Sequence, residues 1–148
     1  MVVGVLYDYF RAPDASTAAA VLDWPGGPIG LDELDVVAGK GIDPEVMMRT
    51  LQSLLTGVDY DELPWGEMLA MTPDPDGPAV ERLTVELRDA LAAAEVGRLP
   101  AVAEQWVRTE EFWDRWTAAD VLPFLYEVTA LARRARQAGE LLYCWCCV

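Results

Sequence analysis

Apolar segments of strand length stand near both ends of the chain, with stretches of helical spacing between them. Residues 2–11 alternate so that both faces of a strand are largely apolar. Residues 141–148 carry no charged side chain and follow an arginine-rich helical stretch that ends at Gly139. Strands that are apolar on both faces suit the inside of a sheet, so we expect these two strands to pair at its centre.

The pattern between these strands predicts several amphipathic helices and two short strands. Asp14 or Ser16 can cap a first helix, and Asp43 followed by Pro44 can start a second helix, which Gly57 closes. Further helices are expected along the apolar stripe from Val80 to Ala94, from Pro100 past Trp106, and from Asp120 onwards, and short strands are expected at residues 34–37 and 67–71.

This order of elements predicts an α+β fold. We expect a single compact domain over residues 1–148, with a small sheet whose N- and C-terminal strands are central and pack against several amphipathic helices. The chain of 148 residues is 53% hydrophobic and contains six tryptophans, which is enough to build a core without disulfides.

The net charge of −14 limits the classes of partner. Residues 1–80 contain 14 acidic and three basic side chains, a balance of −11, whereas residues 81–148 contain 11 acidic and eight basic ones, a balance of −3. This field repels nucleic acid and anionic membranes, and it either attracts a basic protein or serves only to keep the protein soluble. The chain shows no membrane-spanning run and no signal peptide, so we expect a cytoplasmic protein.

The absence of histidine removes the commonest general base and the commonest metal ligand. The three cysteines, Cys144, Cys146 and Cys147, lie together in the terminal strand and lack distant partners for a disulfide framework. We expect them to act as small buried side chains, with Cys144 and Cys146 on one face of the strand and Cys147 on the other. No cofactor and no metal site are expected.

Three segments of the chain resemble the YfbM-like bacterial family, a domain of unknown function. They are the opening strand through residues 7–10, residues 41–43 with the Leu-Thr-Gly helix ending at residues 55–57, and the last helix at residues 133–140. Residues 44–47 differ from the family, which often has a lysine and a tryptophan there. The resemblance implies a compact cytoplasmic α+β domain, and it implies no reaction and no catalytic residues.

The densest acidic cluster is the main candidate site. Its carboxylates could form a charged protein-binding surface, carry out acid–base chemistry, or belong to a plain solvated loop. Exposed tryptophans near it would serve as anchors for a partner. The candidate residues are Asp59, Tyr60, Asp61 and Glu62, supported by Asp32, Glu33 and Asp35, with Trp24 and Trp65 as the anchors.

A second group of aromatic residues precedes the last helix. Trp106, Phe112, Trp113 and Trp116 are interleaved with charged residues that include Glu110 and Glu111. Their spacing is typical of a helix face that packs into a core, and the alternatives are the floor of a ligand pocket or an interface hot spot.

These features favour a non-catalytic binding protein. Its acidic surface would engage a basic protein partner, as inhibitor or immunity proteins engage basic toxins. The alternative is a small-molecule-binding protein or a carboxylate-based enzyme. In that case several carboxylates should converge with Tyr7 or Tyr9 in a pocket above the sheet.

Overall fold

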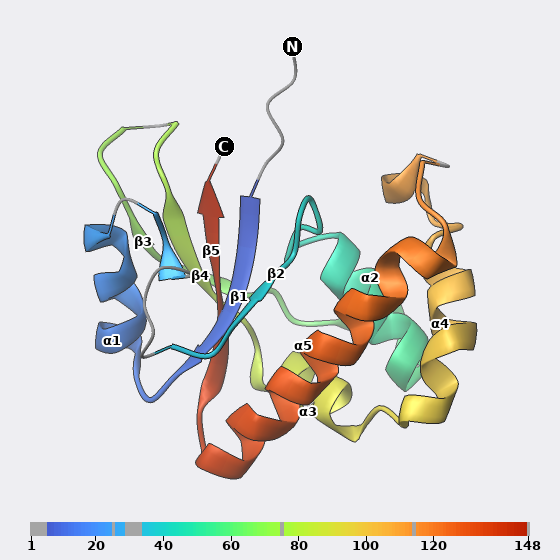
Figure 1. Ribbon diagram of the computed structural model, residues 1–148. Helices are drawn as coiled ribbons and strands as arrows, with labels where there is room; N and C mark the ends of the chain where they lie inside the picture. Colours follow the sequence, from blue (N-terminus) through green and yellow to red (C-terminus); the bar gives the residue numbers. More distant parts are fainter. Residues whose placement is uncertain (1–5, 25, 29–33, 75, 114, 148) are drawn as a thin grey trace.

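The computed structural model describes residues 6–24, 26–28, 34–74, 76–113 and 115–147. They form an α+β domain in which one antiparallel sheet is covered by helices (Figure 1). In chain order the strands and helices are β1 (Leu6–Ala12), α1 (Ala15–Ala19), β2 (Val36–Ala38), α2 (Met47–Thr56), β3 (Glu67–Met71), β4 (Ala79–Arg82), α3 (Val85–Ala93), α4 (Leu99–Trp106), α5 (Ala118–Ala138) and β5 (Leu141–Cys147).

The two terminal strands pair at the centre of the sheet, as the sequence predicts. The strand order is β2-β1-β5-β4-β3, and every neighbouring pair is antiparallel. Strand β5 is the middle strand, and Tyr9 of β1 and Glu81 of β4 both lie opposite its Cys144. The part of the predicted first strand over residues 2–5 lies outside the described residues.

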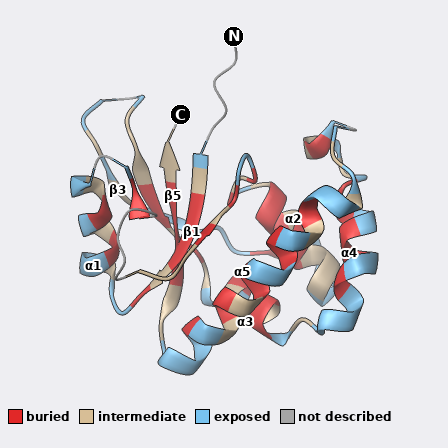
Figure 2. Cartoon of the chain, viewed as in Figure 1, coloured by how far each residue is buried: buried red, intermediate tan, exposed pale blue. Residues whose placement is uncertain are grey.

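The helices form unequal layers on the two faces of the sheet. Helix α1 covers one face, and α2 to α5 cover the other (Figure 1). Figure 2 shows buried residues along the strands and on the inner sides of the helices. Cys144 and Cys146 contact the core of the larger layer, whereas Cys147 packs beside Trp145 in the core under α1. This division of the cysteines between the two faces confirms the predicted alternation of β5.

Several predicted helix boundaries are confirmed. The Asp14 carboxylate accepts a hydrogen bond from the backbone N–H of Thr17 at 2.7 Å and caps α1. Asp43 is not the N-cap predicted for α2: its carboxylate accepts a hydrogen bond from the Val46 N–H at 2.6 Å in the preceding turn, and the helix itself begins at Met47 with Val46 as its N-cap. Gly57 and Gly139 end α2 and α5 in the left-handed conformation, with φ of 75° and 71°.

Other boundaries also differ from the prediction. The predicted stripe from Val80 is in part a strand: residues 79–82 pair with β3 and β5, and α3 begins only after Thr84, whose side chain caps it. The predicted first helix is divided into α1 and a 3-10 turn, Ala20–Asp23. Helix α5 begins at Ala118, because Thr117 is its N-cap and Asp120 closes the capping box at the third position.

No helix within the described residues is both long and apolar enough to cross a bilayer.

Candidate functional site

A buried arginine organises the predicted acidic cluster. Arg49 lies on α2 with a relative exposure of 3%, and its guanidinium carbon lies 4.3 Å from the ring centroid of Tyr60 and 3.6 Å from that of Trp65. Its Nη2 donates hydrogen bonds to the carbonyl oxygens of Tyr60, at 3.1 Å, and Leu63, at 2.7 Å. Arg49 therefore holds residues 60–65 against α2 through both aromatic rings and backbone.

The charge of Arg49 is balanced by carbonyl dipoles and ring faces. It forms no ion pair within the described chain, and its Nε and Nη1 are buried without a hydrogen-bond partner among those residues. Burying a guanidinium in this way is energetically unfavourable, because the desolvation of its charge is only partly compensated. Its contacts fix the positions of the Tyr60 and Trp65 side chains.

The three acidic residues of the cluster remain on the surface beside these rings. Asp59, Asp61 and Glu62 are exposed, and they belong to or precede a 3-10 turn, Tyr60–Glu62. The Asp59 carboxylate accepts a hydrogen bond from the Asp61 N–H at 3.2 Å. No ion pair with a basic side chain neutralises the three carboxylates within the described residues. We call residues 59–65, with Trp65 at 60% exposure, the acidic-aromatic segment.

The other predicted partner-binding residues do not join this segment. Asp35 accepts hydrogen bonds from Arg11 Nε at 2.9 Å and from Arg134 Nε at 2.6 Å, so its charge ties β1 to α5. Arg134, followed by Arg11, holds the pKa of Asp35 below its ordinary value. Trp24 is 53% exposed but follows the turn after α1, in the other helical layer. Asp32 and Glu33 lie outside the described residues.

A second group of carboxyls gathers on the face of the sheet that the larger helical layer covers. Glu81 of β4 is 5% exposed and lies opposite Cys144 in the register. Burial first, and then the nearby carboxyls of Glu45 and Asp43, raise the pKa of Glu81 to about 7. Gly66 crosses directly over this carboxyl, since a Cβ at Gly66 would lie 3.0 Å from Glu81 Oε2.

Tyr7 belongs to the same group. Burial first, and then the charges of Asp43 and of other nearby groups, raise the pKa of its phenol to about 12. Cys146 lies opposite Tyr7 in the sheet, and its Sγ is 3.8 Å from that of Cys144. Tyr7 thus stays a neutral hydroxyl at neutral pH. Sequence reasoning missed Glu81, because an acid in a segment predicted as helix gave no sign of burial.

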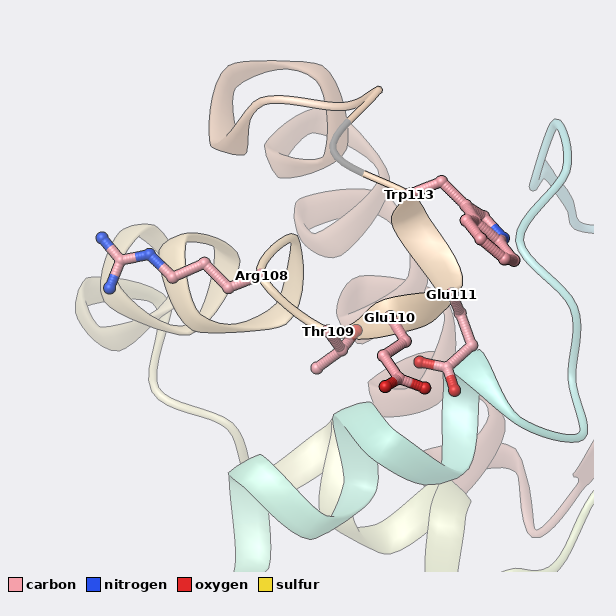
Figure 3. Close-up of a pocket in the computed structure, with 5 residues that line it drawn as sticks. All are labelled: Arg108, Thr109, Glu110, Glu111 and Trp113. Carbon is pink, nitrogen blue, oxygen red and sulfur yellow. The ribbon is translucent and has the colours of Figure 1, made fainter.

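The aromatic group before α5 divides into packed and exposed members. Trp106 and Phe112 are buried with ring centroids 5.0 Å apart, and Trp106 Nε1 donates to the Met47 carbonyl oxygen at 2.9 Å. Trp116 packs against Phe112 at 6.0 Å. Trp113 is different, since it is 78% exposed and lines a surface hollow of about 510 Å³ (Figure 3).

No cluster of three or more His, Cys, Asp or Glu side chains with the geometry of a metal site occurs in the described part of the chain.

Comparisons with known proteins assign no function to these sites. No family model, no curated protein and no solved structure matches the chain.

Proposed function

We propose that this protein binds a basic protein partner through the acidic-aromatic segment. The observation that carries the proposal is the packing of Arg49 against the rings of Tyr60 and Trp65, which holds an exposed indole in the same short segment as three exposed carboxylates. A rigid aromatic side chain loses little conformational entropy on binding, so it is suited to anchor an interface.

Charge supports the same proposal at longer range. The whole chain carries a net charge of −14. Within the described residues, Asp59, Asp61 and Glu62 form no ion pair with a basic side chain. A partner with a basic surface is attracted over a distance of about 10 Å at 0.1 M salt, and this attraction weakens as salt is added. We therefore expect association that is fast at low salt and strongly dependent on ionic strength.

The test is a pull-down from a lysate of the source cell at low and moderate salt, followed by affinity measurement with the purified captured protein. The variant Asp59→Asn/Asp61→Asn/Glu62→Gln removes the charges of the segment. The matched control Asp74→Asn/Asp76→Asn/Glu95→Gln removes three exposed charges elsewhere. Salt-sensitive capture of a basic protein that only the first variant loses would support the proposal. A blank at both salts, or equal loss in both variants, would contradict it.

A specific observation also favours a second function, a small-molecule site with acid–base capacity. Glu81 is buried beside Glu45 and Asp43, and Asp43 lies near Tyr7 as well, which is part of the arrangement that this alternative expects, although the hollow described above is lined by other residues. A ligand with an amine or another basic group suits these carboxyls. A thermal-shift screen of metabolites at pH 6 and pH 8 tests this function. Stabilisation that Glu81→Gln abolishes would support it, and equal shifts in both proteins would contradict it.

A further inference from the structure

The turn between α4 and α5 displays one tryptophan in an uncommon conformation. Trp113 has φ of 51° and ψ of 33°, in the left-handed region that bulky residues rarely occupy. Its N–H donates to the Glu110 carbonyl oxygen at 2.9 Å, and the preceding Phe112 is buried against Trp106. The strain is held by this packing, and its result is an indole that faces outwards at 78% exposure.

Two carboxylates share the hollow with this indole. Arg108, Thr109, Glu110, Glu111 and Trp113 line it, and we call this site the Trp113 hollow. Figure 3 shows the carboxylates of Glu110 and Glu111 close together, while Arg108 extends away from them on the other side of the turn. The guanidinium of Arg108 lies 4.0 Å from the Glu104 carboxylate, and no ion pair involves Glu110 or Glu111 within the described residues.

These groups match the chemistry of a guanidinium ion. A planar cation can stack on an indole face and at the same time donate hydrogen bonds to carboxylates beside it. A lysine ammonium is a more strongly hydrated point charge, and it lacks the flat surface that stacks on the ring.

We propose that the Trp113 hollow is a receptor for an arginine side chain of the basic partner protein. The inference rests on the proposed function, and it adds a second contact at a defined place. Both contacts adjoin α2. Arg49 of this helix holds the acidic-aromatic segment, and the carbonyl of its Met47 receives the Trp106 indole that supports the turn.

The direct test is fluorine NMR of protein labelled with 5-fluorotryptophan, with the Trp113 resonance assigned from Trp113→Phe. The probe is N-acetyl-arginine amide, and the control probe is the citrulline analogue, which has nearly the same shape but no charge. We expect a saturable shift of the Trp113 resonance with arginine alone. The shift should be lost in Glu110→Gln/Glu111→Gln and kept in Glu104→Gln. Equal shifts with both probes, or none with arginine, would overturn the inference.

Binding of the captured partner separates this inference from the proposed function. We expect Trp113→Ala to weaken partner binding by about tenfold, and Trp113→Phe to weaken it less, because a ring face remains. Wild-type affinity in Trp113→Ala, with loss of binding in the Asp59→Asn/Asp61→Asn/Glu62→Gln variant, would reject the hollow and keep the proposed function. A guanidinium-specific shift without any captured protein would support the receptor chemistry and reject the protein partner.

Discussion

At the scale of single residues, two charged side chains that the pattern of polar and apolar positions predicts to lie on the surface are buried. Arg49 stands in α2 beside apolar neighbours, and Glu81 stands in a short strand, yet both are nearly inaccessible. Their burial comes from segments distant in sequence, residues 60–66 in both cases. Local periodicity carries no information about such coverage, and for this reason the centre of the candidate site was not predictable.

Replacing Arg49 with methionine should lower the free energy of unfolding by about 2 kcal/mol. The substitution removes two hydrogen bonds to backbone carbonyl oxygens and two contacts between the guanidinium and aromatic rings. Urea unfolding monitored by circular dichroism measures the change. Arg108→Met is the control, and its effect should stay within about 0.5 kcal/mol, since the side chain is largely exposed. An equal effect of both substitutions would show that Arg49 has no special structural role.

Glu81 should make the folded state less stable as pH rises. Its pKa is about 7 in the folded protein and 4.5 for a glutamate in the unfolded chain. Between these pH values the folded protein therefore binds more protons than the unfolded chain does. Its contribution is therefore full below pH 4.5, falls through the interval and levels off above pH 7. Glu81→Gln should reduce the loss of unfolding free energy between pH 5 and pH 8 by on the order of 1 kcal/mol, after solvent screening is allowed for. Urea midpoints at pH 5 and pH 8 give the comparison, and identical slopes would refute it.

At the scale of elements, signals at the ends of helices were more informative than the stripes within them. Asp14, Gly57 and Gly139 mark ends that the structure reproduces, because caps depend on a few neighbouring residues, whereas Asp43 lies in the turn before α2 and does not cap it. The stripe through Val80 failed, because Val80 faces the core from a strand between β3 and β5 and a single apolar position fits either period. The pairing partners that decide the matter are distant in sequence.

The capping box of α5 gives a prediction at this scale. Thr117→Ala should lower the free energy of unfolding by about 1 kcal/mol, because the capping box of α5 loses the Thr117 hydroxyl, which donates to the Asp120 carboxylate at 3.0 Å. Thermal unfolding measures the loss. Ala119→Ser, an exposed change in the same turn, should alter stability by less than about 0.5 kcal/mol. A larger effect of the control would assign the loss to helix propensity and contradict the cap.

At the scale of the whole molecule, the fold class and the central pairing of the terminal strands were predictable, because both strands are apolar on two faces and must be covered on both. The site was predictable only in part. The sequence indicated the acidic-aromatic segment, in which Tyr60 and Trp65 meet at Arg49, but it grouped Trp24 with this segment although that residue lies in the other layer. Charge can be counted in a sequence, whereas the division of a surface between two layers depends on the completed fold.

Removal of residues 141–148 should prevent folding, because β5 is bonded to both β1 and β4 and its loss divides the sheet. Circular dichroism and hydrogen exchange of the shortened chain should show an unfolded protein. Cys146→Ala, a small change in the same strand, should retain the native spectrum. A cooperative native-like transition in the shortened chain would contradict the central role of β5.

The position of β5 also determines when the protein can fold. Its partner β1 comes from the opposite end of the described chain, so the two strands can meet only after the intervening helices have been synthesised. Contacts of such long sequence separation slow folding, since the entropy of closing the loop is lost before the pairing compensates it. During synthesis the edge of β1 and the apolar faces of the early helices are therefore uncovered until β5 has been made, and this exposed apolar surface is prone to aggregation.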